Sequence, residues 1–518
     1  MSRKSKRHER AKPEAQASAQ AYAGNGGRIN SPYPIASDST SFRWRPQIDK
    51  DVLSLIPQYR QRAMLSDARY IYTSEGMVSG AVHTRADYVV GAAWMPAYLG
   101  SDARYKAAVT PLLQSWVKRC EMRGGQFVWN RIMWLLSRSL DVDGDAFVVL
   151  TEDESSWPRI QLLEAHRVGN PDDTGEIKSG PYAGMSIHGG VVYDKFMRAV
   201  AYNLLPPDVI TKRPGKNEPN FIPASGVVHV WDPKWVSSTR GIPTLCHGIK
   251  HWYSASEATQ AEETAIIANS KIALIEKNET GRRSLDRTPF DTNNLTAGQA
   301  SPHIETMADG LIRFIKKDGD ISAHSFARPG DEWEKFMTFI LRGAFSGMGW
   351  PIEFGHDMSQ LGAGAIRGVV GQVKRSVETR QSVLETPATS MVLHAIGTWM
   401  RTKQVPFTPD WFNIGFSYPP TCSVDVGRDS QNRREDLAIG SRTLTDVVTE
   451  DGGDIDTHLR TRARDFRRAQ EIAIEEGVPV GAVFDPARTF GQPVSFGATI
   501  PSMGDDMPEM PGKKGEDE

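Results

Sequence analysis

Cysteine is scarce in this chain, and a membrane-length apolar run is missing. Three cysteines occur among 518 residues, far apart and without the spacing of metal ligands. A reducing compartment fits this usage. No run of about 18 apolar residues occurs, and the basic start, MSRKSKRHERAK, is not followed by the apolar segment of a signal peptide. We therefore expect a chain that neither spans a membrane nor is secreted by that route.

The sequence also lacks the short motifs of common catalytic chemistry. It contains no GK[ST] phosphate loop, no HExxH zinc motif and no GxSxG nucleophile elbow. The segment GAGAIRG lacks the third glycine of a dinucleotide loop, and no strand pattern leads into it. The histidines are dispersed and are each expected to be structural: His166, His229, His356 and His458. We expect no enzyme activity, no metal and no cofactor, so that any ATP is hydrolysed by a partner.

Three alternating aspartates come closest to a metal site. With Glu152 at the twelfth position, Asp141, Asp143 and Asp145 imitate a calcium loop, but the required glycine stands at 144 instead of at the sixth position. Residues 147–150 are typical of a strand, so the pattern favours a β-turn. Clustered carboxylates also suit two-metal chemistry. A metal-dependent nucleic-acid-processing enzyme is therefore an alternative.

The remaining composition is ordinary globular material. Hydrophobic residues make up 39% and charged residues 24% of a chain long enough for two to four domains. The formal net charge of −2 gives no general attraction to nucleic acid, although local clusters are far from neutral. Residues 1–42, which are basic and rich in small polar residues, are expected to form a disordered arm, and residues 481–518 a flexible tail.

Residues 44–244 mix helical and strand patterns and predict an α+β domain. Helices are expected at 51–72 and 105–122, and the segment 80–100 passes from helix into strand. Strand patterns separated by Gly, Pro and Asp turns cover four further segments: 146–150, 160–163, 198–205 and 226–231.

From residue 245 onward, helical patterns dominate. An Ala-rich helix is predicted at 245–275 and a second at 331–347, with a short strand at 310–315 between them. Trp350-Pro351 opens a loop that can move while its anchors stay packed. The long helix after it carries an apolar stripe, and Pro387 should kink or end it. The stripe is Ile366, Val369, Val370, Val373 and Val377.

The last part of the chain is predicted to begin with a strand-like segment and to continue as helices. Residues 406–420 have the strand pattern, and residues 428–477 the helical one. The final helix carries apolar residues on one face: Ile455, Leu459, Ala463, Phe466 and Ala473.

Five segments, in this order and spacing, resemble the portal proteins of lambda-type tailed bacteriophages, over roughly residues 42–477. They are GAVHTRADYVVGAAW, DVDGDAFVVL, VVHVWDPKWVSSTRGIPTL, AEETAIIANSKIALIE and GWPIEFGHDMSQLGAGAIR. The resemblance implies a ring of about twelve copies at one capsid vertex, through which a packaging motor drives double-stranded DNA.

The resemblance also implies a division of this α+β chain into the parts of a portal. The wing would be 43–244 with the long helix and wing segment 364–425. The stem helices would be 245–275 and 331–349, joined by the clip at 276–330. The tunnel loop would be 350–363 and the crown 426–480.

Two of these parts carry residues that suit a DNA conduit. Cations repeated around a bore would accumulate phosphate contacts, so a stem lining it should lean acidic. Glu257, Glu262 and Glu263 fit, although an ordinary solvated helix face is the alternative. The tip of a moving loop needs small uncharged residues. Gln360, Gly362 and Gly364 fit, and a plain surface loop that caps a helix is the alternative.

Cations gather in three other places. A basic crown face could contact packaged DNA, or it could form salt bridges with Glu435, Asp436, Asp465 and Glu471. The face is Arg460, Arg464, Arg467 and Arg468. A basic stripe on the long helix is interpreted as inter-subunit pairing with Glu378 and Glu385. The stripe is Arg367, Lys374, Arg375 and Arg380. The exposed-looking clip cations are Arg313, Lys316 and Lys317.

The sequence therefore predicts a portal, or head-tail connector, in the virion, assembled in the host cytoplasm. The expected partners are further copies of the chain, double-stranded DNA, the large terminase subunit, head-completion or adaptor and tail proteins, and capsid and scaffold proteins. A non-phage oligomeric scaffold is the second alternative to the portal.

Overall fold

The computed structural model describes eleven segments of the chain: residues 50–92, 94–170, 175–206, 220–271, 274–278, 305–307, 310–316, 331–355, 362–419, 426–450 and 455–483. The predicted arm, nearly all of the predicted tail, Gln360, Lys317 and His356 lie outside them. The chain divides into two compact units, Met1–Arg442 with Glu450–Gly452, and Thr443–Thr449 with Gly453–Glu518.

The described part of the first unit starts with three helices, α2 (Val52–Leu55), α3 (Gln58–Ser74) and α4 (Gly76–Val90). The single helix predicted over 51–72 is wrong, because it is broken at Pro57. Proline has no backbone N–H and keeps the residue before it, here Ile56, out of the helical region. The change from helix to strand after Val90 is confirmed, since β1 (Met95–Tyr98) follows α4.

A three-stranded antiparallel sheet in the order β3-β2-β8 forms the centre of the unit. Its strands are β2 (Asp145–Glu152), β3 (Pro158–Glu164) and β8 (Val227–Trp231), which confirms three predicted strands. Alternate residues of β2 face opposite sides, as the two-residue period of a strand requires. Val148 joins one buried cluster, and Phe147 joins another.

Helices α5 (Ala103–Trp116), α6 (Trp129–Val142) and α9 (Ala363–Arg401) supply the largest core, on the Val148 side of the sheet. Fully buried tryptophans dominate it: Trp94, Trp116, Trp129 and Trp399. Burying side chains of this size is the main stabilisation of the unit. β12 (Ile414–Ser417) pairs with β1 at the edge of this core, and it is the only strand within the described part of the strand-like segment 406–420.

A second antiparallel sheet packs on the Phe147 side, in the order β4-β5-β6-β7. Its strands are short, β4 (Ser186–His188), β5 (Val191–Tyr193), β6 (Ala199–Asn203) and β7 (Phe221–Pro223). β6 confirms the strand predicted over 198–205. The fold is therefore α+β, as the sequence predicts.

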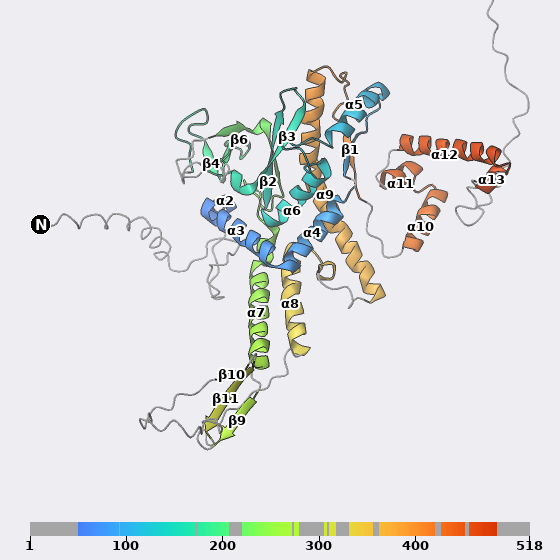
Figure 1. The fold of residues 1–518 in the computed structure, drawn as a ribbon. Helices are drawn as coiled ribbons and strands as arrows, with labels where there is room; N and C mark the ends of the chain where they lie inside the picture. The colour runs from blue at the N-terminus through green and yellow to red at the C-terminus, as the bar shows by residue number, and fades with distance from the viewer. Residues whose placement is uncertain are drawn as a thin grey trace, which may run out of the picture. The chain divides into compact units, whose positions relative to one another are not determined.

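Two long helices, α7 (Ile249–Lys271) and α8 (Asp331–Met348), lie side by side and join this body to a small sheet (Figure 1). The helix predicted over 245–275 begins with the short 3-10 turn η3 (Thr244–Gly248) and ends four residues early, because β9 (Leu274–Asn278) takes over. β9 runs parallel to β11 (Gly310–Lys316), and β10 (Glu305–Met307) runs antiparallel to β11.

Helix α9 does not end at Pro387 but continues to Arg401. Proline removes one hydrogen bond from the helix, yet the residues around it are held by the core, where Leu384, Ala388 and Met391 are fully buried.

Helices also make up the described C-terminal residues, as predicted. α10 (Val426–Ala438) belongs to the first unit. The second unit contains most of α11 (Leu444–Glu450), together with α12 (Ile455–Glu475) and α13 (Val480–Val483). In α12 the side chains of Ala469 and Ala473 are buried.

Candidate functional site

Helices α7 and α8, which cover the predicted stem, approach each other most closely where they leave the body. A Cβ atom added to Gly347 of α8 would lie 2.8 Å from the backbone nitrogen of Gly248, and one added to Gly343 would lie 3.1 Å from the His251 ring. Trp252 and Phe345 meet edge to face beside this crossing, with ring centroids 5.2 Å apart. Only glycine lets the two backbones come this close, so α7 and α8 are fixed to each other at one end.

The predicted acidic residues lie along α7, away from that crossing. Glu257 and Glu263 are exposed, and Glu262 is half-buried. Lys250 is exposed as well, at the end of α7 near the body. Among the α7 side chains that the structure describes, there are therefore two exposed carboxylates, which stand on different sides of the helix, and one exposed ammonium group.

Both anchors of the predicted tunnel loop are well defined. Helix α8 ends at Met348, Gly349 follows with a φ of +65°, and Trp350 is buried with 2% of its surface exposed. After the turn η4 (Ile352–Phe354), the next described residue that the sequence singled out is Gly362, the N-terminal cap of α9. Gly364 lies in the first turn of α9, and both glycines are exposed with open space around them.

A buried charge cluster holds the first of these anchors, at the end of α8. Arg85 of α4 donates from Nη1 to the carbonyl of Met348 (2.9 Å) and to Oδ1 of Asp141 (3.2 Å), and its guanidinium lies over the Trp350 ring. Arg380 of α9 donates to the same carboxylate oxygen at 2.7 Å. Burial, and then the neighbouring charge of Arg380, lower the pKa of Arg85 to about 10, so Arg85 is still a cation at neutral pH. One aspartate thus joins the end of α8 to the middle of α9.

One sequence-based interpretation is corrected by this cluster. Arg380 is 5% exposed and belongs to the core, so it cannot pair with a neighbouring subunit. The other members of the basic stripe, Arg367, Lys374 and Arg375, are exposed, and Lys374 lies 3.9 Å from Glu378 of its own helix. The sequence offered no signal for the position of Arg380, because Asp141 lies 239 residues away.

Asp143 and Asp145 are also bound by arginines. Arg69 of α3 donates to Asp143 at 2.7 Å. Arg240 binds both oxygens of Asp145, at 2.6 and 3.0 Å, and also donates to the carbonyls of Val168 and Ala165. Among the residues that the structure describes, no group of three or more His, Cys, Asp or Glu side chains is arranged to hold a metal ion. The DVDGD segment instead ties four distant parts of the chain together.

The turn within this segment follows from its glycine. Gly144, at the end of α6, has a φ of +84°, and a Cβ there would lie 2.6 Å from the backbone of Ile242. Burial alone would raise the pKa of Asp145, but the charge of Arg240 and the hydrogen bonds from His229 and Arg240 lower it to about 2. His229 is stacked between Phe147 and Trp231 and is structural.

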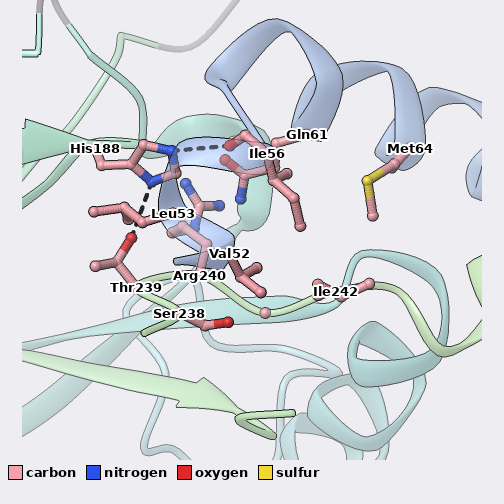
Figure 2. Close-up of a pocket in the computed structure, with 11 residues that line it drawn as sticks. Val52, Leu53, Ile56, Gln61, Met64, His188, Ser238, Thr239, Arg240 and Ile242 are labelled. Atoms are coloured by element: carbon pink, nitrogen blue, oxygen red, sulfur yellow. Dashed lines mark hydrogen bonds between the residues drawn. The ribbon is translucent and has the colours of Figure 1, made fainter. Parts of the chain in front are cut away.

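A small cavity lies beside Arg240 (Figure 2). The His188 ring lines it, with Nε2 2.9 Å from the carbonyl oxygen of Ile56 and Nδ1 3.0 Å from the hydroxyl of Thr239. Burial lowers the pKa of His188, so the ring is neutral, donates from Nε2 and accepts at Nδ1. The contacts join α2 to the segment that leads into α7.

The predicted basic face of α12 is exposed along its length. Arg468 forms an ion pair with Glu471 at 3.0 Å. Arg460, Arg464 and Arg467 form no ion pair with any residue that the structure describes. The salt-bridge alternative therefore holds for one of the four arginines. In the clip segment, Arg313 and Lys316 lie in β11.

A family model described as phage portal protein, lambda family, matches residues 42–381, which is more than half of the chain. No curated protein matches the chain. None of the helices in the described segments is both long and apolar enough to cross a membrane.

Three solved structures from gene transfer agent (GTA) particles are among those that match. The neck of an empty GTA particle computed with C6 symmetry has 12% identity and a TM-score of 0.45, over 74% of this chain and 90% of that chain. The virion of a native GTA particle has 12% identity and a TM-score of 0.46, over 74% and 92%. The neck of a native GTA particle computed with C12 symmetry has 11% identity and a TM-score of 0.44, over 74% and 90%.

Proposed function

This chain belongs to the lambda family of phage portal proteins, and we propose that about twelve copies of it close into a ring at one vertex of a capsid. Double-stranded DNA passes through the bore of the ring during packaging and leaves through it at ejection. The large terminase subunit supplies the energy, since the sequence has no phosphate loop of its own. The protein is thus a mechanical part and not an enzyme.

The parts of the portal are assigned along the chain as follows. The wing is 43–244 together with 364–425, and the stem is 245–275 and 331–349. The clip, 276–330, faces outward and docks the terminase through cations such as Arg313, Lys316 and Lys317, and later the head-completion or adaptor and tail proteins. The crown, 426–480, faces the capsid interior, and the rim of the ring contacts capsid and scaffold proteins.

The two-helix stem supports the assignment of the bore. α7 and α8 are antiparallel, fixed to each other near the body, and connected through a small sheet. Exposed Glu257 and Glu263 and half-buried Glu262 give α7 an acidic character that does not bind phosphate. A wall of this kind lets a duplex slide.

The loop between α8 and α9 supports a second role, contact with the moving duplex. Its α8 end is held by a buried cluster, in which Arg85 binds the end of α8 and Arg380 binds Asp141 from the middle of α9. A loop whose anchors are fixed can change shape without disturbing the wing. We assign Gln360, Gly362 and Gly364 to its tip and its hinge at α9.

Imaging of the purified full-length chain tests the proposal. The family match carries it, and it predicts end-on views of a ring with a central hole wide enough for a duplex. A monomer with Mg²⁺-dependent nuclease activity would contradict it in favour of an enzyme. A filament or a dimer without a hole would favour a scaffold.

The loop assignment has its own test. Replacing both Gly362 and Gly364 with Val should leave the ring intact, because both positions are exposed and have open space. The stiffer backbone should shorten the packaged DNA or reduce its retention in assembled particles. The matched control is Gly368→Val with Gly371→Val, further along the exposed part of α9. Normal packaging by the first pair would show that the loop has another role.

A further inference from the structure

Helix α8 has an aromatic face that the rest of its own copy leaves uncovered. Phe336 and Phe339 are 51% and 73% exposed, whereas Leu341 and Phe345 on the opposite side are buried. Two neighbouring phenylalanines in water are costly, and such patches mark protein interfaces.

Cations flank this face. Lys335, Phe339 and Arg342 stand at i, i+4 and i+7, which places them in one stripe along α8. Both cations are exposed, and neither pairs with a carboxylate among the residues that the structure describes. The stripe therefore presents an apolar centre with a positive charge one turn away on each side.

Helix α7 carries a complementary charge at a matching height. Because His251 packs on Gly343 and the helices are antiparallel, Phe339 lies level with about residue 255 of α7, and Lys335 with about residue 259. Exposed Glu257 therefore lies at a height between Arg342 and Lys335. It stands about 120–140° around α7 from His251 and Trp252, which contact α8 of the same copy, so a second copy can bring cations to it.

We propose that the Lys335–Phe339–Arg342 face of α8 packs against the Glu257 side of α7 in the next copy of the chain. This inference rests on the proposed ring. Rotation about an axis parallel to the stem keeps equal heights level, so the same contact repeats from copy to copy in a head-to-tail manner. Opposite charges fix its register, and the phenylalanines lose their contact with water.

The contact has a consequence for the bore. Glu257 of the neighbouring copy lies between Lys335 and Arg342 and offsets part of their charge, so the ring adds less positive charge beside the passing phosphates.

Disulfide trapping tests the pairing in the full-length chain, with Cys422 replaced by Ser. The double variant Phe339→Cys with Glu257→Cys should give, after mild oxidation, a ladder of covalent multimers on a non-reducing gel. A head-to-tail contact links every copy to the next, so the ladder should extend to the full ring. The matched control, Phe196→Cys with Glu257→Cys, uses another exposed phenylalanine, 76% exposed at the β5–β6 turn, and should give no ladder.

Each possible result separates the proposed contact from the proposed ring. Rings that are intact by imaging but give no ladder would overturn the pairing while leaving the portal function in place. Covalent dimers alone would indicate a two-fold contact and would also overturn it. If the unmodified chain forms no ring, the proposed function itself fails.

Charge reversal provides a second readout. Arg342→Glu or Glu257→Arg alone should lower the fraction of chain in rings at least several-fold at low salt. The two changes together should restore most of it, because the pair is re-formed with opposite polarity. Single reversals without effect would contradict the charge register.

Discussion

A single carboxylate, that of Asp141, holds two buried guanidinium groups. Arg85 and Arg380 both donate to its Oδ1, and all three side chains are buried. Removing one partner from a buried ion pair leaves an uncompensated charge, which costs about 3–5 kcal/mol. We expect Asp141→Ala to destabilise the first unit by this amount, measured by chemical unfolding.

The control for that variant is Glu378→Ala, which removes an exposed i,i+4 pair with Lys374. Exposed pairs contribute about 0.5 kcal/mol or less. Equal losses of unfolding free energy in the two variants would show that the buried Asp141 cluster stabilises the first unit no more than an exposed ion pair does.

Asp145 gives a pH dependence whose direction follows from its pKa. The pKa is about 2 in the folded chain, against an ordinary value of 3.8. A carboxylate with a lowered folded pKa stabilises the fold fully above pH of about 4, and loses that contribution as the pH falls towards 2. The contribution is about 2 kcal/mol.

Thermal unfolding between pH 7 and pH 2.5 checks this. The melting temperature of Asp145→Asn should lie below that of the unmodified chain by a constant gap at neutral pH, and the gap should narrow below pH 4. Glu154→Gln, an exposed acid in the β2–β3 turn, should show no gap. A gap that stays constant down to pH 2.5 would contradict the role of the ionised carboxylate.

Residue roles were the least predictable part of the chain. From the place of Gly144 the sequence favoured a turn over a calcium loop at 141–152, but it could not name the arginines that bind the three aspartates. Arg85, Arg240 and Arg380 lie 56, 95 and 239 residues from their partners, and only the folded chain brings them together. A periodic pattern reports one helix or strand at a time.

At the scale of elements, the α7–α8 crossing depends on glycine. A Cβ at position 347 would meet backbone atoms of Gly248 at 2.8 and 3.0 Å, and backbone cannot move aside cheaply. We expect Gly347→Ala to destabilise the stem by about 1–3 kcal/mol, seen as faster amide hydrogen exchange in α7 and α8.

The matched control is Gly371→Ala, in an exposed part of α9 with nothing near its added Cβ. Alanine in an exposed helix stabilises by roughly 0.5–1 kcal/mol relative to glycine. The two Gly→Ala substitutions should therefore change the stability in opposite directions. A change in the same direction in both would refute the packing argument.

Element prediction succeeded where a periodic pattern was long and failed where local chemistry interrupted it. The stripe Ile366 to Val377 correctly predicts α9. The break at Pro57 and the replacement of helix by β9 at Leu274 were missed, because pairing partners and chain breaks are not visible in periodicity. Helix α6 had no predicted counterpart, although its residues Trp129, Ile132, Met133, Leu136 and Leu140 follow the helical period.

At the scale of the whole molecule, the unpaired arginines of α12 predict a salt-dependent contact with DNA. Changing Arg460, Arg464 and Arg467 to Gln should leave the ring unchanged, weaken its binding of duplex DNA and flatten the dependence of that binding on salt. Fluorescence anisotropy over a salt series measures both effects.

The control changes three arginines that are already ion-paired, Arg123, Arg198 and Arg401. It alters the net charge equally, so an equal loss of DNA affinity would assign the effect to overall charge and not to the α12 face. At this scale, the family was recognisable from five ordered segments. The subunit contact was not, because it depends on exposed side chains of α7 and α8 that only the three-dimensional structure distinguishes from buried ones.

The ion pair between Asp141 and Arg380 can form only late in the synthesis of the chain. The aspartate leaves the ribosome 239 residues before its second arginine. At about 5–20 residues per second, roughly 10–50 seconds pass before the cluster can be completed. During that interval the first unit has a core without its α9 layer. A trigger-factor-like holdase that shields apolar surface should therefore raise the yield of assembled rings more than it would for a protein whose buried charges pair with near neighbours.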